Sequence, residues 1–344
     1  MPNPRLPAEW EPQSGVMITW PHQHSDWADS LNEIELVYLD LVKAITRFEK
    51  LLINTYDENH LQQVKKRIRA HELSDENIIF SIVETNDTWT RDYGPITLEK
   101  HNDRLLDFRF NGWGNKFDAS LDNQVTRELF EKGIFKAENI TSAEFVLEGG
   151  SIESDGKGTL LTTSACLLTE TRNTLYSKEN IVDILENTLG ISKILWLDHG
   201  YLSGDDTDSH IDMLARFTDE QTIAYVKCED KKDEHYEDSC KMEAQLKTFT
   251  NWEGKPYKLK ALPFPSAIFS EEDGRRLPAS YANFLIINNA VLVPVYNDKK
   301  DKKALDIISS CFPDREIIGI PFLAAIKQNG SLHCLTMQIP EGYL

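Results

Sequence analysis

A recurring order of elements constrains the fold of this 344-residue chain more than any other feature. Apolar alternation, turn residues and amphipathic spacing predict one unit several times: a hairpin, then a helix, then one more strand. Four copies follow one another at intervals of about 60 to 70 residues. They comprise 96–99, 105–110, 120–133 and 145–148; 151–153, 159–163, 178–189 and 193–198; 210–217, 222–227, 234–249 and 257–262; and 281–287, 290–296, 302–311 and 316–320.

A fifth copy is split between the two ends of the chain. Its predicted elements are a strand at 331–338, a hairpin partner at 16–20, a helix at 30–48 and a strand at 51–56, followed by an additional helix and strand at 59–72 and 77–83. Because one such unit cannot bury both its sheet and its helix alone, five units with joined ends predict a closed α/β ring in a single domain, 1–344. The alternative is an ordinary mixed α/β sheet whose hairpins are alike by chance.

Polar side chains gather where the units begin, at positions that a ring would bring to its axis. These residues are Asp92, Glu148, His210, Asp212, Asn283 and Cys334. His210 and Asp212 are two apart in the run HIDMLARF, so as strand residues they are predicted to project from one face. The simpler alternative is a buried Asp–His pair that orients a loop.

Cys334 lies in an apolar run, GSLHCLTMQI, which is predicted as a strand. An inert buried cysteine is the ordinary expectation there. A thiol becomes a nucleophile when a nearby imidazolium or a guanidinium substrate stabilises its thiolate. His333 is adjacent in sequence and is predicted to point to the opposite strand face, so His210 is the better candidate for the catalytic base.

Three carboxylates near one centre, those of Asp92, Glu148 and Asp212, are costly unless a cation compensates them. A planar guanidinium does so, because its N–H donors match paired carboxylates, and Trp89 could cover its face. The alternative for Trp89 is a core tryptophan beside an Arg91–Asp92 ion pair.

Composition and spacing disfavour other classes of protein. A net charge of −19 disfavours nucleic acid and anionic membrane surfaces as partners. No His-Glu-x-x-His, Cys-x-x-Cys or glycine-rich phosphate loop is present, so neither a metal nor an organic cofactor is predicted. The chain lacks a signal-peptide pattern and a long apolar run, which predicts a cytoplasmic protein.

Four motifs in order carry a resemblance: NDTWTRDYGP (86–95), LEGGSIESDG (147–156), DDTDSHID (205–212) and GSLHCLT (330–336). With them, nearly the whole chain resembles the agmatine deiminases of the bacterial-type peptidylarginine deiminase family. The resemblance implies a five-bladed α/β propeller with pseudo-fivefold symmetry, closed by pairing of the N- and C-terminal segments. It also implies a possible homodimer.

The same resemblance implies roles for single residues. Cys334 matches the nucleophile, His210 the general acid and base, Asp92 and Asp212 the carboxylates that grip the guanidinium, and Glu148 a further acid; Trp89 matches a pocket wall, Asn283 a pocket asparagine and Asp206 the partner of the substrate's far amine. Met337 and Ser209 depart from the commonest pattern, near where a substrate tail could run.

The implied reaction is the hydrolysis of agmatine to N-carbamoylputrescine and ammonia through a thiouronium on the cysteine, within polyamine biosynthesis or arginine catabolism. The expected substrate is thus a small cationic guanidine. Two alternatives stay open. One is a deiminase of peptidyl arginine or another guanidine, and the other is a non-catalytic protein that binds guanidines or polyamines.

Overall fold

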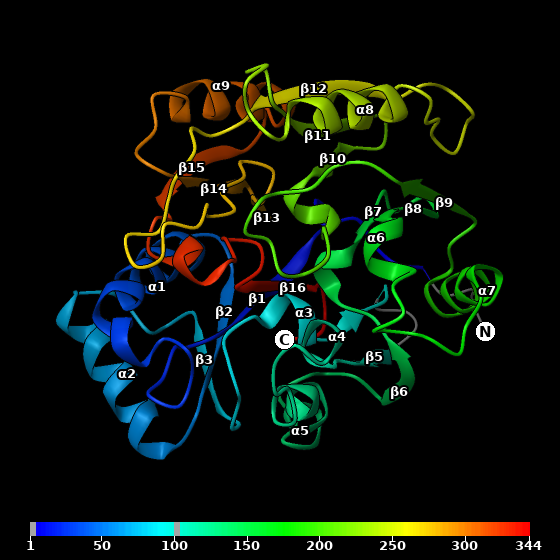
Figure 1. Ribbon diagram of the computed structural model, residues 1–344. Helices are drawn as coiled ribbons and strands as arrows, with labels where there is room; N and C mark the ends of the chain where they lie inside the picture. Colours follow the sequence, from blue (N-terminus) through cyan, green and yellow to red (C-terminus); the bar gives the residue numbers. More distant parts are fainter. Residues whose placement is uncertain (1–4, 100–103) are drawn as a thin grey trace.

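The computed structural model describes residues 5–99 and 104–344, and its strands form five small sheets around a common centre (Figure 1). The first sheet has four strands in the order β16-β1-β2-β3, namely Thr336–Pro340, Gln13–Thr19, Lys50–Thr55 and Ile78–Ile82. The other four sheets have three strands each: β4 to β6 (Ile96–Thr97, Arg104–Arg109, Asn139–Val146), β7 to β9 (Ile152–Ser154, Thr159–Thr163, Lys193–Leu197), β10 to β12 (Ala215–Asp219, Thr222–Lys227, Lys258–Pro263) and β13 to β15 (Leu285–Ile287, Ala290–Val295, Glu316–Pro321).

Every sheet repeats the order of elements that the sequence predicts. An antiparallel hairpin comes first, and the strand after the helix then pairs parallel to the second strand of the hairpin. In the split unit β16 pairs antiparallel to β1, with Val16 opposite Gln338, and β2 follows parallel to β1. The two ends of the chain therefore complete one sheet, as predicted.

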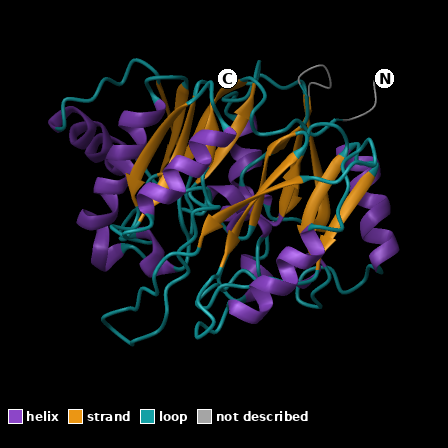
Figure 2. Cartoon of the chain, turned by 90° about the horizontal axis from the view of Figure 1, so that it is seen from above, coloured by secondary structure: helices purple, strands orange, loops and turns teal. Residues whose placement is uncertain are grey.

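Helices lie mostly on the outside, while the strands gather in the middle of the molecule (Figure 2). The helices are α1 (Leu31–Ile45), α2 (Glu58–Ala70), α3 (Thr90–Tyr93), α4 (Gly112–Asn115), α5 (Val125–Glu131), α6 (Ser164–Leu167), α7 (Lys178–Leu189), α8 (Tyr236–Leu246) and α9 (Asp301–Cys311). Helix α7 shows why the sequence forms them: Ser177 and Asn180 make a capping box, and Gly190 ends the helix with a left-handed φ of 71°. None of the helices in the described ranges is long and apolar enough to cross a membrane.

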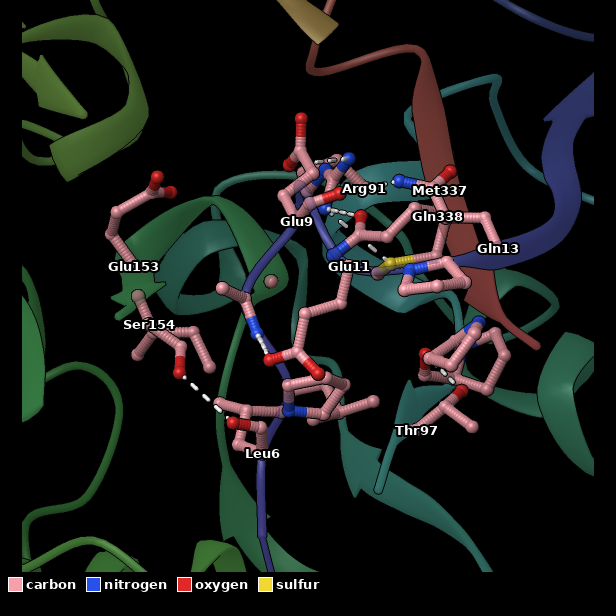
Figure 3. A pocket seen from close by; sticks show the side chains of 18 residues that line it. Leu6, Glu9, Glu11, Gln13, Arg91, Thr97, Glu153, Ser154, Met337 and Gln338 are labelled. Carbon is pink, nitrogen blue, oxygen red and sulfur yellow. Dashed lines mark hydrogen bonds and ion pairs between the residues drawn. The ribbon is translucent and has the colours of Figure 1, made fainter. Parts of the chain in front are cut away.

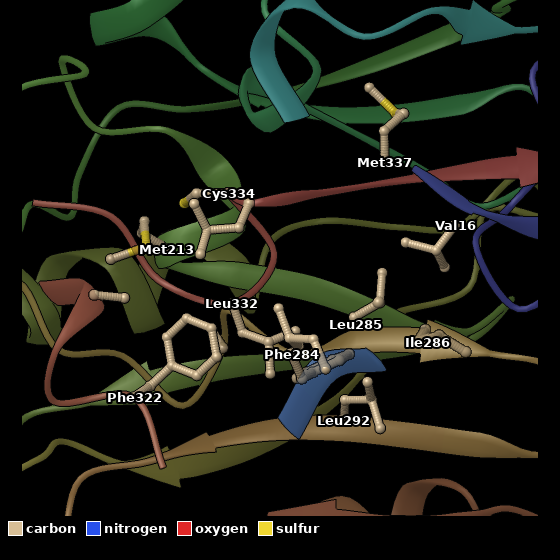
Figure 4. Packing of buried hydrophobic residues seen from close by; sticks show 14 of the residues in the cluster. Val16, Met213, Phe284, Leu285, Ile286, Leu292, Phe322, Leu332, Cys334 and Met337 are labelled. Atoms are coloured by element: carbon tan, nitrogen blue, oxygen red, sulfur yellow. The ribbon is translucent and has the colours of Figure 1, made fainter. Parts of the chain in front are cut away.

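Apolar packing joins neighbouring units across the ring. Val16 on β1, Leu285 on β13, Leu292 on β14 and Met337 on β16 belong to one buried cluster (Figure 4). Cys334 lies in the same cluster, so the thiol has an apolar surrounding on one side.

Three strand predictions fail near the axis. Residues 210–214 precede β10 and include a 3-10 turn at Ile211–Met213, residues 331–335 precede β16, and residues 281–284 precede β13. In these segments side chains satisfy backbone groups that a neighbouring strand would otherwise pair with. The Ser280 hydroxyl donates to the Met213 carbonyl at 2.6 Å, and the His333 amide donates to Asn283 Oδ1 at 2.8 Å. Strand β6 also differs, because it runs from 139 to 146 and not from 145 to 148.

Candidate active site

Gly150 marks the point where the predicted carboxylates and histidine meet. A Cβ atom built on this glycine would lie 2.6 Å from His210 Nδ1, 2.9 Å from Asp92 Oδ1 and 3.1 Å from Asp212 Oδ2. All three side chains are buried. The structure therefore brings these predicted residues from two separate segments, α3 and the turn at 210–213, around one backbone position that only a glycine fits.

Asp92 is held by two neutral donors. Trp113 Nε1 donates to its Oδ2 at 2.9 Å, and the Gly150 amide donates to its Oδ1 at 3.0 Å. Burial raises the pKa of Asp92 to about 6. Trp113 has a left-handed φ of 55° within the glycine-flanked stretch NGWGN, an unusual backbone conformation for a tryptophan that aims its ring at the carboxylate.

Glu148 connects His210 to a buried arginine. His210 Nε2 lies 3.3 Å from Glu148 Oε2, and Arg172 Nε donates to Glu148 Oε1 at 3.0 Å. Burial opposes ionisation of Glu148, but His210 and Arg172 outweigh it and lower its pKa. Burial likewise disfavours the imidazolium, yet Asp92 and the Cys166 and Glu148 side chains raise the pKa of His210 well above its ordinary value. The histidine is thus placed to carry a proton at neutral pH.

Cys334 faces a carboxylate and an amide. Its Sγ lies 3.5 Å from Asn283 Oδ1 and 4.0 Å from Asp212 Oδ2. Burial, Asp212 and Asp92 raise the pKa of this thiol well above its usual range. A cation bound between the two carboxylates would oppose that shift, because it compensates their charge and favours the thiolate.

His333 does not point away from the site, so the prediction for its orientation is wrong. Its Nδ1 lies 2.7 Å from Asp212 Oδ2 and its Nε2 lies 2.7 Å from Glu9 Oε2. The alternation argument fails because residues 331–335 form no strand, and adjacent side chains in a turn need not face opposite ways.

Trp89 is buried beside a second tryptophan, with its ring centroid 5.8 Å from that of Trp27. Its Nε1 donates to Asp87 Oδ2 at 3.2 Å. The alternative of an Arg91–Asp92 ion pair is not what forms, since Arg91 contacts Gln338 and lies 3.8 Å from Glu9. Trp89 also requires the glycine at position 330, because a Cβ atom there would lie 2.0 Å from its ring.

Asp206 lies in the half-buried loop 203–209 before His210. Its carboxylate accepts a hydrogen bond from Asn329 Nδ2 at 2.8 Å, and no ion pair to it occurs among the described residues. Asp208 differs, because Lys116 and Arg172 both bind its carboxylate. Cations from distant elements therefore reach this loop, although its own sequence contains none.

Asp205 serves the turn itself. Its carboxylate accepts hydrogen bonds from the backbone amides of Thr207 and Ser209. Of the loop's three aspartates, Asp206 alone thus keeps a carboxylate that neither caps the turn nor pairs with a cation, as far as the described residues show.

Cys166 joins this site without a sequence signal. Its Sγ lies 3.5 Å from Glu148 Oε2, and burial with Glu148 raises its pKa to about 11. Potential metal-ligand atoms of Glu148, Cys166 and His210 lie within 4.8 Å of one another. Arg172 already supplies positive charge to Glu148, so proton chemistry fits this group better than a metal does.

A separate small pocket of roughly 50 Å³, partly open to solvent, contains none of the eight predicted site residues in its lining (Figure 3). Glu9 and Arg91 form part of its wall, together with Gly149, Glu153 and Met337. Because Glu9 contacts His333 and Gly149 precedes Gly150, this wall lies close behind the site.

Comparisons with known proteins agree with the motifs. Residues 5–340 match the Porphyromonas-type peptidyl-arginine deiminase family. The chain is 33% identical to an agmatine deiminase of Medicago truncatula, with 97% of this chain and 96% of that protein covered.

Solved structures give the same result. The agmatine deiminase of C. jejuni with substrate bound superposes with a TM-score of 0.89 at 40% identity, over 98% of this chain and 97% of that one. The agmatine deiminase of Enterococcus faecalis superposes with a TM-score of 0.89 at 31% identity, over 98% and 96%.

Proposed function

The chain belongs to the Porphyromonas-type peptidyl-arginine deiminase family, and we propose on this basis that it hydrolyses agmatine to N-carbamoylputrescine and ammonia. One observation carries the proposal: two buried carboxylates and a histidine meet at Gly150, and the Cys334 thiol lies 4.0 Å from one of those carboxylates, a set of charges that suits a planar cation. The relatives named as agmatine deiminases support this choice among guanidines.

Asp92 and Asp212 hold the guanidinium plane, because both carboxylates are buried and each has an oxygen next to Gly150. Trp89 covers one face of the guanidinium in this proposal. Asn283 fixes Cys334 beside Asp212. The bound cation compensates the carboxylates that disfavour the thiolate, so Cys334 ionises when substrate is present.

The thiolate of Cys334 attacks the guanidinium carbon and forms a tetrahedral adduct. His210, protonated beside Asp92 and Glu148, gives its proton to the departing amine, and ammonia leaves. The remaining thiouronium is attacked by water, which the now neutral His210 deprotonates. Collapse of the second adduct releases the ureido product and the thiolate, and the excess proton passes to solvent.

Asp206 contacts the far ammonium of agmatine in this proposal. Its carboxylate has a neutral amide as its partner, whereas Asp205 caps a turn and Asp208 is paired with cations. A carboxylate at this end attracts the ammonium group of agmatine and repels the α-carboxylate of free arginine.

Ammonia release by the purified protein on agmatine, free arginine and an arginine-containing peptide tests the proposal. Agmatine should be the best of the three by at least roughly a hundredfold in kcat/KM. A preference for the peptide would give a peptidyl-arginine deiminase, the activity in the family's description. If no guanidine yields ammonia, the protein is a non-catalytic protein that binds guanidines or polyamines.

A further inference from the structure

His333 occupies a position that the proposed mechanism does not use. It is buried, and each ring nitrogen lies 2.7 Å from a buried carboxylate oxygen, Nδ1 from Asp212 Oδ2 and Nε2 from Glu9 Oε2. The imidazole thus bridges the candidate guanidinium-binding carboxylate and Glu9. Glu9 lies in the wall of the pocket behind the site, where Figure 3 labels it.

The two oxygens of Asp212 have different surroundings. Oδ2 lies 2.7 Å from His333 Nδ1 and 4.0 Å from Cys334 Sγ. Oδ1 is buried and has no hydrogen-bond partner among the described residues. A buried carboxylate oxygen normally accepts a hydrogen bond, and Oδ1 has no donor for one. A guanidinium N–H of the substrate would be that donor.

Glu9 holds the far side of the imidazole in one orientation. Its Oε2 also pairs with Arg216 Nη2 at 2.8 Å, and its Oε1 accepts from the Ile286 amide at 2.7 Å. Arg91 Nη2 lies 3.8 Å from the same carboxylate, and Glu153 pairs with Arg216. With Glu9 bound at both oxygens, the histidine ring cannot turn without losing a short contact.

Two short contacts between one imidazole and two carboxylates need two protons along the chain Glu9–His333–Asp212, since each hydrogen bond requires one. Burial, Arg216 and Arg91 lower the pKa of His333, whereas Glu9 and Asp212 oppose them. Because both contacts are as short as 2.7 Å, we infer that the chain holds two protons and that Nδ1–H donates to Asp212.

We propose that His333 is a positioning residue of the deimination reaction: its Nδ1–H fixes Oδ2 of Asp212, so that Oδ1 is presented to the substrate guanidinium. This inference rests on the proposed function and adds a residue to it. A histidine suits this position, because one side chain must donate in two directions at a fixed separation.

The substitutions His333→Asn and His333→Gln separate the two contacts. The Asn amide nitrogen can take the place of Nδ1 and keep the bond to Asp212, whereas the Gln amide nitrogen can take the place of Nε2 and keep only the bond to Glu9. Each variant loses one hydrogen bond to a buried carboxylate, so a purely structural role affects both alike. We expect His333→Gln to lose about 10- to 100-fold in kcat for agmatine, and His333→Asn to keep activity within about 10-fold of wild type.

Thermal melting of both variants shows whether they fold. Equal losses of kcat in two folded variants, or the larger loss in His333→Asn, overturn the inference while wild-type activity on agmatine keeps the proposed function. If wild type releases no ammonia from any guanidine, the proposed function fails first and the inference falls with it. Should either variant not fold, ¹⁵N-histidine NMR of wild type decides: a protonated His333 Nδ1 with and without agmatine supports the inference, and an unprotonated Nδ1 overturns it.

Discussion

Asp92 and Glu148 are both buried carboxylates, yet their neighbours shift their pKa values in opposite directions. Burial is the main cause that raises the pKa of Asp92 to about 6, and it outweighs the opposing effects of His210, 3.6 Å away, and of the Trp113 hydrogen bond. Glu148 has Arg172 and His210 against it, and its pKa is lowered despite burial. Asp92 is therefore the carboxylate of this site whose charge can be lost in mildly acidic solution.

We expect kcat/KM for agmatine to fall by about tenfold per pH unit below pH 6, because protonation of Asp92 removes a charge that grips the guanidinium. Asp92→Asn should abolish this acid limb and lower kcat by roughly 100-fold or more, since positioning acts on the transition state. Steady-state kinetics from pH 5 to pH 8 measure both. If kcat/KM does not change across this range, or if Asp92→Asn only raises KM, Asp92 does not bind the guanidinium.

Asp206→Asn addresses substrate choice. If Asp206 contacts the distal ammonium, the variant should lose about 10- to 100-fold in kcat/KM on agmatine and much less on an uncharged alkylguanidine of equal length. Asp205→Asn is the matched control from the same loop, because its carboxylate bonds turn amides. Equal losses on the two substrates would refute the ammonium contact and leave the deiminase proposal intact.

The site residues that a sequence pattern predicts differ in kind from those that only the structure reveals. Asp92, His210 and Asp212 stand in polar runs, and Cys334 lies in an apolar run within the motif GSLHCLT, so all four can be found from the sequence. Trp113, Cys166 and His333 matter through tertiary contacts alone, with carboxylates 21, 18 and 121 positions away. Only the glycines around Trp113 give a local sign that its backbone is unusual.

At the scale of elements, turns ahead of the strands carry the site residues, and the strands only place those turns. Apolar alternation predicts strands at residues 331–335 and 210–214, but β16 begins at Thr336 and β10 at Ala215. The side-chain hydrogen bonds from Ser280 and Asn283 that replace the ladder come from a third segment, so no local pattern could show them. The prediction that His210 and Asp212 share a site is consistent with their geometry around Gly150, although the two residues lie in a turn and not on one face of a strand.

Gly150→Ala tests whether that turn needs its glycine. The new methyl group would lie 2.6 Å from His210 Nδ1 and 2.9 Å from Asp92 Oδ1, so it must displace both side chains. We expect loss of at least roughly 100-fold in kcat with the fold retained. Gly319→Ala in β15, whose nearest contact would be 3.2 Å from a Val295 methyl, is the control and should keep activity. Wild-type kinetics for Gly150→Ala would mean that the space at Gly150 is not where substrate binds.

At the scale of the whole molecule, one buried arginine links three parts of the ring. Arg216 on β10 pairs with Glu153 on β7 at 2.7 Å and with Glu9 in the N-terminal segment at 2.8 Å, and it donates to the Phe284 carbonyl before β13. The element order predicted that distant segments meet, because a fifth unit is complete only when β16 joins β1. It could not predict this ion pair, since three separate units supply its partners.

Arg216→Met should destabilise the fold by about 3 to 5 kcal/mol, because it leaves two buried carboxylates without their cation. Urea unfolding of variant and wild type measures the difference. Lys302→Met, which removes an exposed pair with Asp306, should change stability by less than about 0.5 kcal/mol. If the two substitutions cost the same, Arg216 does not hold the units together.

The central claim is that Cys334 forms a covalent bond to the substrate's guanidinium carbon, and mass spectrometry of protein quenched during turnover tests it most directly. Wild type mixed with excess agmatine and quenched in acid within milliseconds should carry an adduct with the mass of agmatine less ammonia, and peptide mapping should place it on Cys334. Cys334→Ser should fold, release no ammonia and carry no adduct. An adduct on Cys166 or another cysteine, or undiminished turnover in Cys334→Ser, would contradict the account.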